Sequence, residues 1–121
     1  MGSRSVLVVD DDRAIVDALA TILTEEGYIV RRAYDGLSAL EEAEIAPPDL
    51  VLSDIAMPGL DGIALTQRLR ERGVPVVLLS AAMTDPEIPG VPYLPKPFDL
   101  EHLLAVAERV LDHSSDQRSI V

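Results

Sequence analysis

The residues of this sequence that could do chemistry follow short apolar runs. The ends of these runs carry carboxylates, a hydroxyl and an ammonium: Asp10 and Asp11, Asp54, Ser80 and Lys96. Carboxylates that lie close together repel one another, so they stay ionised at neutral pH only beside a cation, and otherwise one takes up a proton. Mg²⁺ prefers oxygen ligands, and a hydroxyl and an ammonium can bind phosphate oxygens. These side chains, brought together, would form a magnesium site suited to a phosphate group.

The apolar runs predict the strands that would bring these side chains together. Val6–Val9, Leu50–Ser53 and Val76–Leu79 are short and continuous, which is typical of strands buried on both faces of a parallel sheet. Ile29–Ala33 is a weaker strand whose two arginines indicate a sheet edge, and Val91–Leu94 is a short fifth strand. Segments with helical spacing alternate with the strands, which predicts a parallel sheet covered by helices on both faces. Because parallel strands end at one edge, the candidate residues should gather there.

The connection between the fourth and fifth strands has an unusual composition. Residues 81–92 must provide it, although a crossover with its helix needs about 10–12 residues or more. Pro86, Pro89 and Pro92 lie in this segment, and each proline removes a backbone donor and clashes with the preceding turn. We therefore expect the helix after the fourth strand to be missing or reduced to one turn. Partners then bind the first and last helices, or the apolar strip of the sheet that is left uncovered is itself a docking site.

Length, charge and composition limit the classes to which the chain can belong. Its 121 residues fit one domain, which we expect at residues 1–112 with a flexible tail at 113–121. The net charge of -11 argues against direct nucleic-acid binding. The absence of cysteine and the presence of only two histidines argue against a zinc site. No apolar run is long enough to span a membrane and no signal peptide is evident, so the expectation is a cytoplasmic protein without membrane association.

Four segments together resemble the signature segments of receiver domains in bacterial response regulators of two-component signal transduction. They are Val8–Asp11, Leu52–Gly62, Leu79–Ala81 and Lys96–Phe98, in the family's order and spacing. The resemblance spans about residues 5–112. Agreement of four separate segments is far more specific than an aspartate pair alone. The resemblance implies a flavodoxin-like, doubly wound α/β fold like that of the chemotaxis regulators, with a five-stranded parallel sheet in the order 2-1-3-4-5.

The resemblance also assigns an acceptor and a metal site. Asp54 matches the family's phosphoacceptor. Asp11 matches the acidic residue that binds Mg²⁺ directly, and Asp10 matches its neighbour, which often acts through water. Ala56 occupies the position at which the family uses a backbone carbonyl as a metal ligand. Mg²⁺ is therefore the implied cofactor, with Mn²⁺ as a substitute.

Three further residues match positions that bind the phosphoryl group or report its presence. Ser80 matches the hydroxyl that bonds the phosphoryl group and moves on activation. Tyr93 matches the aromatic that follows that hydroxyl inward, although simple packing is an alternative role for it. Lys96, the only lysine in the chain, matches the phosphoryl-binding lysine. The family also implies a cis peptide bond between Lys96 and Pro97.

The implied function is that of a phosphoacceptor in a two-component system or phosphorelay. A sensor histidine kinase or a histidine phosphotransfer protein would donate a phosphoryl group to Asp54, and the added charge would switch the binding of a downstream partner. The domain would be a signalling protein that promotes only its own phosphorylation and dephosphorylation, not an enzyme. The kinase, the output and the oligomeric state, including a homodimer, stay open.

Two alternatives remain on the sequence alone. One is a receiver-like module that binds partners without phosphorylation, although the complete set of acidic, hydroxyl and lysine residues argues against it. The other is a Mg²⁺-dependent phosphohydrolase that forms an aspartyl phosphate, because Asp10 and Asp12 have the spacing of such enzymes. A chain of 121 residues leaves no room for the cap domain that those enzymes carry.

Overall fold

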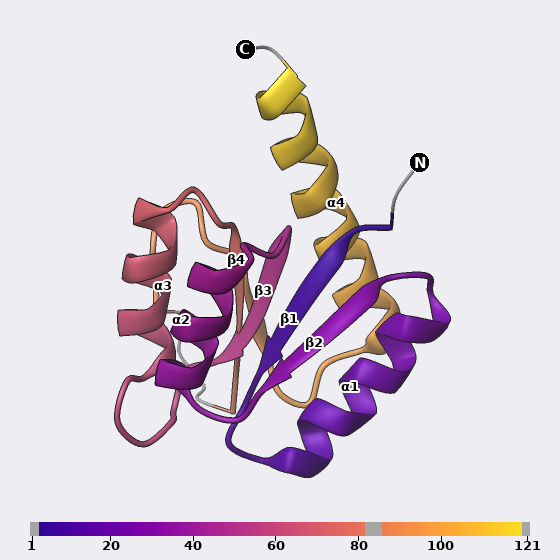
Figure 1. Ribbon diagram of the computed structural model, residues 1–121. Coiled ribbons are helices and arrows are strands. Elements are labelled where there is room, and N and C mark those ends of the chain that lie inside the picture. Colours follow the sequence, from indigo (N-terminus) through magenta and orange to yellow (C-terminus); the bar gives the residue numbers. More distant parts are fainter. Residues whose placement is uncertain (1–2, 82–85, 120–121) are drawn as a thin grey trace.

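Strands and helices alternate along the chain and build a single sheet between two layers of helices (Figure 1). The computed structural model describes residues 3–81 and 86–119, with side chains as far as residue 113. The elements are β1 (Ser5–Val9), α1 (Arg13–Glu25), β2 (Ile29–Ala33), α2 (Gly36–Ile45), β3 (Leu50–Asp54), α3 (Gly62–Glu71), β4 (Val76–Ser80), β5 (Tyr93–Pro95) and α4 (Leu100–Ser119).

The sheet has five strands in the order β2-β1-β3-β4-β5, and every neighbouring pair is parallel. At the carboxyl ends of the strands, Val9 lies opposite Ser53 and Asp54 lies opposite Leu79. The chain builds outward from β1 to β2 and then continues from β3 on the other side, so the strand order switches between β1 and β3. Ligands of open parallel sheets bind at such a switch point. The fold class and strand order predicted from the sequence are confirmed.

Two separate apolar cores lie on the two faces of the sheet, because successive side chains of a strand point to opposite faces. Val6 and Val8 of β1 face the core that α1 and α4 cover, and that core includes Leu103 of α4. Leu7 and Val9 face the second core, under α2 and α3 (Figure 1). All five side chains are buried. A central strand buried on both faces has no polar position, which explains its continuous apolar run.

Strand β2 lies at the edge of the sheet, as its arginines predicted. Arg31 donates hydrogen bonds to the carbonyl and carboxylate oxygens of Glu42 in α2, the latter at 2.8 Å. Arg32 forms an ion pair with Asp17 in α1, also at 2.8 Å. Arg31 therefore contacts a helix on one face of the sheet and Arg32 contacts a helix on the other.

Aspartates begin the first three helices. The carboxylate of Asp12 accepts a hydrogen bond from the backbone N–H of Ala14, and Asp35 and Asp61 play the same part at α2 and α3. Such caps satisfy backbone donors that have no partner within the helix, and each contributes about 1 kcal/mol. The caps fix where each of these helices begins, on the side of the sheet at which the strands end.

The connection from β4 to β5 contains no helix at residue 81 or at residues 86–92, the part of it that the structure describes. The prediction of a missing or very short helix is confirmed for these residues, and residues 82–85 lie outside the described part. The connection closes with β5 paired to β4, so that Ser80 lies opposite Pro95.

This irregular segment nevertheless covers the sheet beside it. Ile88, Val91 and Tyr93 pack against the core under α2 and α3. Val76 and Leu78 of β4, which face that core, are buried. The short connection suggested that an apolar strip of the sheet would be uncovered. At these positions the sheet is covered, because side chains of the irregular segment pack on it where a helix would otherwise lie.

The last helix runs farther than the sequence suggested. α4 extends to Ser119, past residue 112, where we expected the domain to give way to a tail. The division into a domain and a flexible tail stays a prediction. None of the helices in the described part of the chain combines the length and apolar character that crossing a bilayer requires.

Candidate functional site

The candidate side chains lie at the edge where the parallel strands end. Asp54 and Ser80 are the last residues of β3 and β4, Asp10 follows β1, and Lys96 follows β5. The backbone N–H of Lys96 donates a hydrogen bond of 2.6 Å to the carbonyl of Ser80, which ties the end of β5 to the end of β4. The shared edge expected from the sequence is therefore present, at the switch point of the sheet.

Three carboxylates form a cluster at this edge. One oxygen from each of Asp10, Asp11 and Asp54 lies within 4.8 Å of the others. Asp10 is 2% exposed and Asp54 8% exposed, whereas Asp11 is exposed to solvent. The backbone N–H of Asp12 donates to Asp10 Oδ1 at 3.0 Å, which fixes the Asp10 carboxylate. The cluster offers only hard oxygen ligands and opens to solvent at Asp11, as a Mg²⁺ site requires.

Ionisation of the Asp54 carboxyl group is unfavourable in these surroundings. Burial raises the pKa of Asp54, and the charge of Asp10 raises it further. The charge and hydrogen bond of Lys96 and the backbone N–H of Ile55, which donates to Asp54 Oδ1 at 3.0 Å, act in the opposite direction. Since the net pKa is raised, Lys96 does not fully offset the neighbouring acids, and the site favours additional positive charge.

Lys96 provides the positive charge of the site. Its Nζ lies 2.8 Å from Asp10 Oδ2 and 3.5 Å from Asp54 Oδ1. Burial by itself would lower the pKa of Lys96, but the hydrogen bond and charge of Asp10, with the charge of Asp54, raise it. The Lys96-Pro97 peptide bond is cis, which confirms the prediction. The lysine is thus held as a cation between two carboxylates.

Comparison with known proteins decides the family. A family model of the response regulator receiver domain matches residues 6–108. The chain belongs to this family. Among curated proteins, the receiver domain is 43% identical over 111 residues to the response regulator MprA of Mycobacterium ulcerans, across 85% of this chain and 48% of the relative. The chain spans about half the length of the curated relatives it matches.

Solved structures show the same fold. The chemotaxis protein CheY4 of Vibrio cholerae aligns with a TM-score of 0.81 and 32% identity, over 90% of this receiver domain and 99% of that chain. The receiver domain of the Francisella response regulator 1452 aligns with a TM-score of 0.84 and 32% identity, over 93% and 99% of the two chains. The chain is therefore a receiver domain of the kind found in two-component systems.

The loop after β3 of the receiver domain returns to Asp54 through a close glycine contact. The N–H of Gly62, the first residue of α3, donates to the carbonyl of Ile55 at 2.8 Å. A Cβ at Gly62 would overlap the backbone carbonyl of Asp54. Ala56 lies inside this loop, and its side chain is exposed. The sequence did not indicate this contact, which comes from the folding of the loop back onto β3.

The two proposed switch residues of the receiver domain lie on neighbouring strands. Ser80 is 2% exposed at the end of β4. Tyr93, the first residue of β5, lies opposite Leu78 and packs, half-buried, against the core under α2 and α3. Packing, the alternative role for Tyr93, is therefore observed, and its role in switching stays a prediction.

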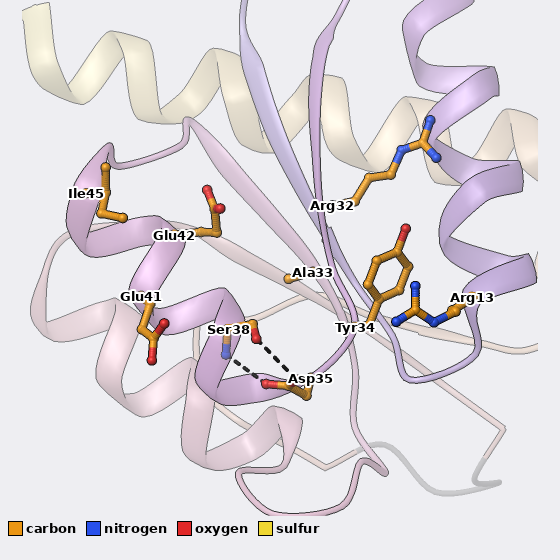
Figure 2. A pocket seen from close by; sticks show the side chains of 9 residues that line it. All are labelled: Arg13, Arg32, Ala33, Tyr34, Asp35, Ser38, Glu41, Glu42 and Ile45. Carbon is orange, nitrogen blue, oxygen red and sulfur yellow. Dashed lines mark hydrogen bonds between the residues drawn. The ribbon is translucent and has the colours of Figure 1, made fainter.

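A polar pocket of the receiver domain that the sequence did not indicate lies between the start of α1 and α2, beside the end of β2 (Figure 2). Its volume is about 360 Å³. Arg13 stacks on Tyr34, with its guanidinium carbon 4.1 Å from the ring centre. Asp17 accepts hydrogen bonds from Arg32 (2.8 Å) and from the Tyr34 hydroxyl (3.2 Å). These contacts fasten the start of α1 to the end of β2, and the only sequence signal was the one-turn spacing of Arg13 and Asp17.

Proposed function

We propose that this receiver domain accepts a phosphoryl group on Asp54 from a phosphohistidine, in a reaction that depends on Mg²⁺. The donor would be a sensor histidine kinase or a histidine phosphotransfer protein. The observation that carries the proposal is the joint position of three carboxylates within 4.8 Å and an ammonium 2.8 Å from Asp10 and 3.5 Å from Asp54. This arrangement suits an acceptor carboxylate, a divalent cation and a phosphate group together.

In the proposed step an oxygen of Asp54 forms a bond to phosphorus. The bond from phosphorus to the imidazole nitrogen of the donor breaks, and its electron pair stays on the imidazole. The Lys96 ammonium and the Ser80 hydroxyl would bind the oxygens of the transferred group. A preorganised charge or donor of this kind typically contributes about 10²–10³-fold to the rate. The chain would thus promote only its own phosphorylation and dephosphorylation.

The ligand atoms present fit Mg²⁺. Asp10, Asp11 and Asp54 offer oxygen atoms alone, and burial and the charge of Asp10 raise the pKa of Asp54, as expected of carboxylates that lack a cation. These three residues and the backbone carbonyl of Ala56 would hold the ion, with Mn²⁺ as a substitute. When bound, the ion would supply positive charge that offsets the charge of the phosphoryl and carboxylate oxygens.

An apolar pocket beside Lys96 supports contact with a protein donor. It has a volume of about 460 Å³ and is lined by Ile15, Ala81, Lys96, Pro97 and Phe98. Exposed apolar surface that adjoins a reactive group is typical of a protein interface. A donor that packed here would present its phosphohistidine next to the lysine.

After transfer, the charge added at Asp54 would change which partner the domain binds. The phosphoryl oxygens would draw the Ser80 hydroxyl towards Asp54, and Tyr93 would follow on the neighbouring strand. The downstream partner is not determined by the site, because the switching surface of this chain lacks a helix between β4 and β5 at the described positions.

Phosphorylation of the purified chain by acetyl phosphate tests the proposal. Intact mass spectrometry should show one added phosphoryl group with Mg²⁺ and none with EDTA. Asp54→Asn should abolish the addition, whereas Asp61→Asn, which makes the same change at a residue that caps α3 and leaves a side chain able to cap it, should not. Uptake by Asp54→Asn at the wild-type rate would refute the acceptor assignment. Failure of the wild-type chain to take up phosphate from acetyl phosphate and from a phosphorylated donor would favour the phosphorylation-independent module.

The phosphohydrolase alternative needs its own measurement. A phosphohydrolase would turn over a generic phosphomonoester such as nitrophenyl phosphate many times per chain. A receiver domain should show no such turnover, because its single acceptor step ends on its own aspartate.

A further inference from the structure

A pocket at the other edge of the sheet has a positively charged rim. Its volume is about 630 Å³, and it lies where β4 and β5 begin, between the end of α3 and the middle of α4. Pro75, Pro92 and Val110 supply an apolar wall. This edge is opposite to the one that carries Asp54, because Pro75 precedes the first residue of β4, whereas Ser80 ends that strand. The pocket is therefore separate from the candidate phosphoacceptor site.

Three basic side chains from two helices line this pocket. Arg70 comes from the last turn of α3, and Arg109 and His113 come from α4. Residues four positions apart lie on the same face of a helix, so Arg109 and His113 are neighbours. The pocket thus combines an apolar wall with two guanidinium groups and an imidazole.

The two arginines of this pocket have no acidic partner among the residues that the structure describes. Arg70 and Arg109 make no ion pair or hydrogen bond within the part of the chain that the structure describes. In contrast, the remaining arginines with described side chains, apart from Arg68, either pair with a carboxylate or, like Arg13, stack on a ring. In a chain with 21 acidic and 10 basic residues, partners for arginine are plentiful. Two unpaired arginines at one pocket therefore form a local positive site on an otherwise acidic protein.

We propose that this pocket binds a small organic anion. Its carboxylate or phosphate group would lie between Arg70 and Arg109, and its apolar body would pack on Pro75, Pro92 and Val110. The planar guanidinium group matches both kinds of oxyanion through paired hydrogen bonds. Small-molecule sites typically have volumes of about 300–1,000 Å³ and are mostly apolar with a few polar groups that fix orientation. The proposal does not depend on phosphorylation of Asp54.

Titrations followed by amide NMR spectra of the full chain test this proposal. Phenyl phosphate and benzoate serve as probes with the two oxyanions, benzamide as the neutral analogue, and inorganic phosphate as the anion without an apolar body. The protein is freed of divalent cations by dialysis beforehand, and no chelator is added to the titrations. At least one aromatic anion should shift the amide signals of Gly90 and Val110 saturably, and the better of the two shows which oxyanion the pocket prefers. Benzamide and inorganic phosphate should shift them much less.

Charge-neutralising variants locate the binding. Arg70→Gln and Arg109→Gln should each weaken binding about tenfold or more, because each removes a charge-assisted pair of hydrogen bonds. Arg68→Gln removes an exposed, unpaired arginine from the same helix as Arg70 but outside the pocket, so its affinity should equal that of the wild type. All three residues are exposed, and circular dichroism should show unchanged folding.

Several outcomes would overturn the proposal. Equal binding of inorganic phosphate would indicate an adventitious ion only, and equal binding of benzamide would indicate apolar contact without charge recognition. Absence of saturable shifts at Gly90 and Val110 with both aromatic anions would refute the site. Equal affinity of the Arg68, Arg70 and Arg109 variants would also refute it. None of these results depends on whether Asp54 accepts a phosphoryl group, so failure here is distinguishable from failure of the proposed function.

Discussion

At the scale of single residues, Lys96 is shared unequally between two carboxylates. Its ammonium lies closer to Asp10 (2.8 Å) than to Asp54 (3.5 Å). A cation that bound the acidic cluster would compete for the Asp10 oxygens and leave the lysine available for phosphoryl oxygens beside Asp54. A compact ammonium on a flexible stem can make this change of partner more easily than a rigid guanidinium fork.

Replacing Lys96 by methionine should slow phosphorylation by acetyl phosphate about 10²-fold or more. Methionine preserves an unbranched stem but removes the ammonium that would stabilise charge on the transferred group. The initial rate of phosphoryl uptake in saturating Mg²⁺ measures the effect. The rate of phosphoryl uptake by Lys96→Arg should lie between those of the wild type and the methionine variant, because arginine restores the positive charge but not the compact shape of the ammonium. A methionine variant phosphorylated at the wild-type rate would show that the lysine takes no part in the reaction.

The raised pKa of Asp54 predicts how stability depends on pH in the absence of metal. A carboxyl group whose pKa is higher in the folded than in the unfolded state binds a proton more tightly when folded. Its contribution to stability is therefore fully present below the ordinary value near 3.8 and is lost as pH rises through the folded-state pKa. Asp54→Asn, which cannot ionise, should raise the melting temperature at pH 7 in EDTA.

The advantage of the asparagine variant should shrink as pH falls towards 3.8, where the wild-type carboxyl group is protonated in the folded state. Melting curves of both proteins over this pH range check the sign. A wild-type protein that is more stable than Asp54→Asn at pH 7 without metal would contradict the raised pKa. Added Mg²⁺ should reverse the order, because it binds the ionised site of the wild type.

At the scale of elements, the starts of α2 and α3 lie close against the end of β3 and the loop that follows Asp54. A Cβ at Gly36, the first residue of α2, would overlap the carbonyl of Leu60. A Cβ at Gly62, the first residue of α3, would overlap the carbonyl of Asp54. These are backbone atoms with little room to move, so the two helices limit the positions that the loop can take.

Gly62→Ala should therefore impair both folding and phosphorylation. Relief of the overlap requires backbone shifts that typically cost about 1–3 kcal/mol, and those shifts would displace Asp54. Urea unfolding and the rate of phosphoryl uptake measure the two effects. Gly59→Ala is the comparison in the same loop, because its φ of 77° is unfavourable for alanine by about 1–2 kcal/mol but nothing lies within 4 Å of its Cβ. If both variants lost stability but kept wild-type phosphorylation, the glycine contact would be structural only.

At the scale of the whole molecule, the sheet separates two cores, and α4 completes one of them. Among the residues of α4 whose side chains the structure describes, 100–113, the buried ones are Leu103, Val106, Ala107 and Leu111. The ion pair of Asp112 with Arg4, at 3.5 Å, is exposed and contributes little. The buried apolar contacts described for α4 therefore lie within residues 1–112.

A chain ending at residue 112 should keep the fold and its phosphorylation. Because the buried contacts of α4 remain, we expect the free energy of unfolding to change by less than about 1 kcal/mol. Urea unfolding of the full and shortened chains, with phosphoryl uptake as the second measurement, checks this domain boundary. As a control for sensitivity, Leu103→Ala in the full chain should cost about 2–5 kcal/mol, because Leu103 is fully buried. A shortened chain as unstable as this variant would place the boundary farther along α4.

Much of the fold and of the candidate site could be predicted from the sequence, and the reasons are local. Strands buried on both faces appear as continuous apolar runs, and their reactive residues follow directly, so the shared edge results from parallel pairing alone. Pro86, Pro89 and Pro92 predicted the absence of a regular helix at residues 86–92, because proline in a helix interior removes a backbone donor and clashes with the preceding turn. The order of the strands came from the resemblance to the receiver family, since apolar runs do not reveal which strands pair.

The sequence alone thus determined the elements, the edge on which they end and the residues gathered there. Only the tertiary structure decided which carboxylate holds Lys96 most closely, because 86 positions separate it from Asp10 and no local pattern measures that distance. Three other features were also decided only by the tertiary structure. They are the extension of α4 past residue 112, the packing of Ile88 and Val91 over the sheet, and the basic pocket. Each depends on segments that meet only after the sheet has formed, and propensity and periodicity act over a few residues at a time.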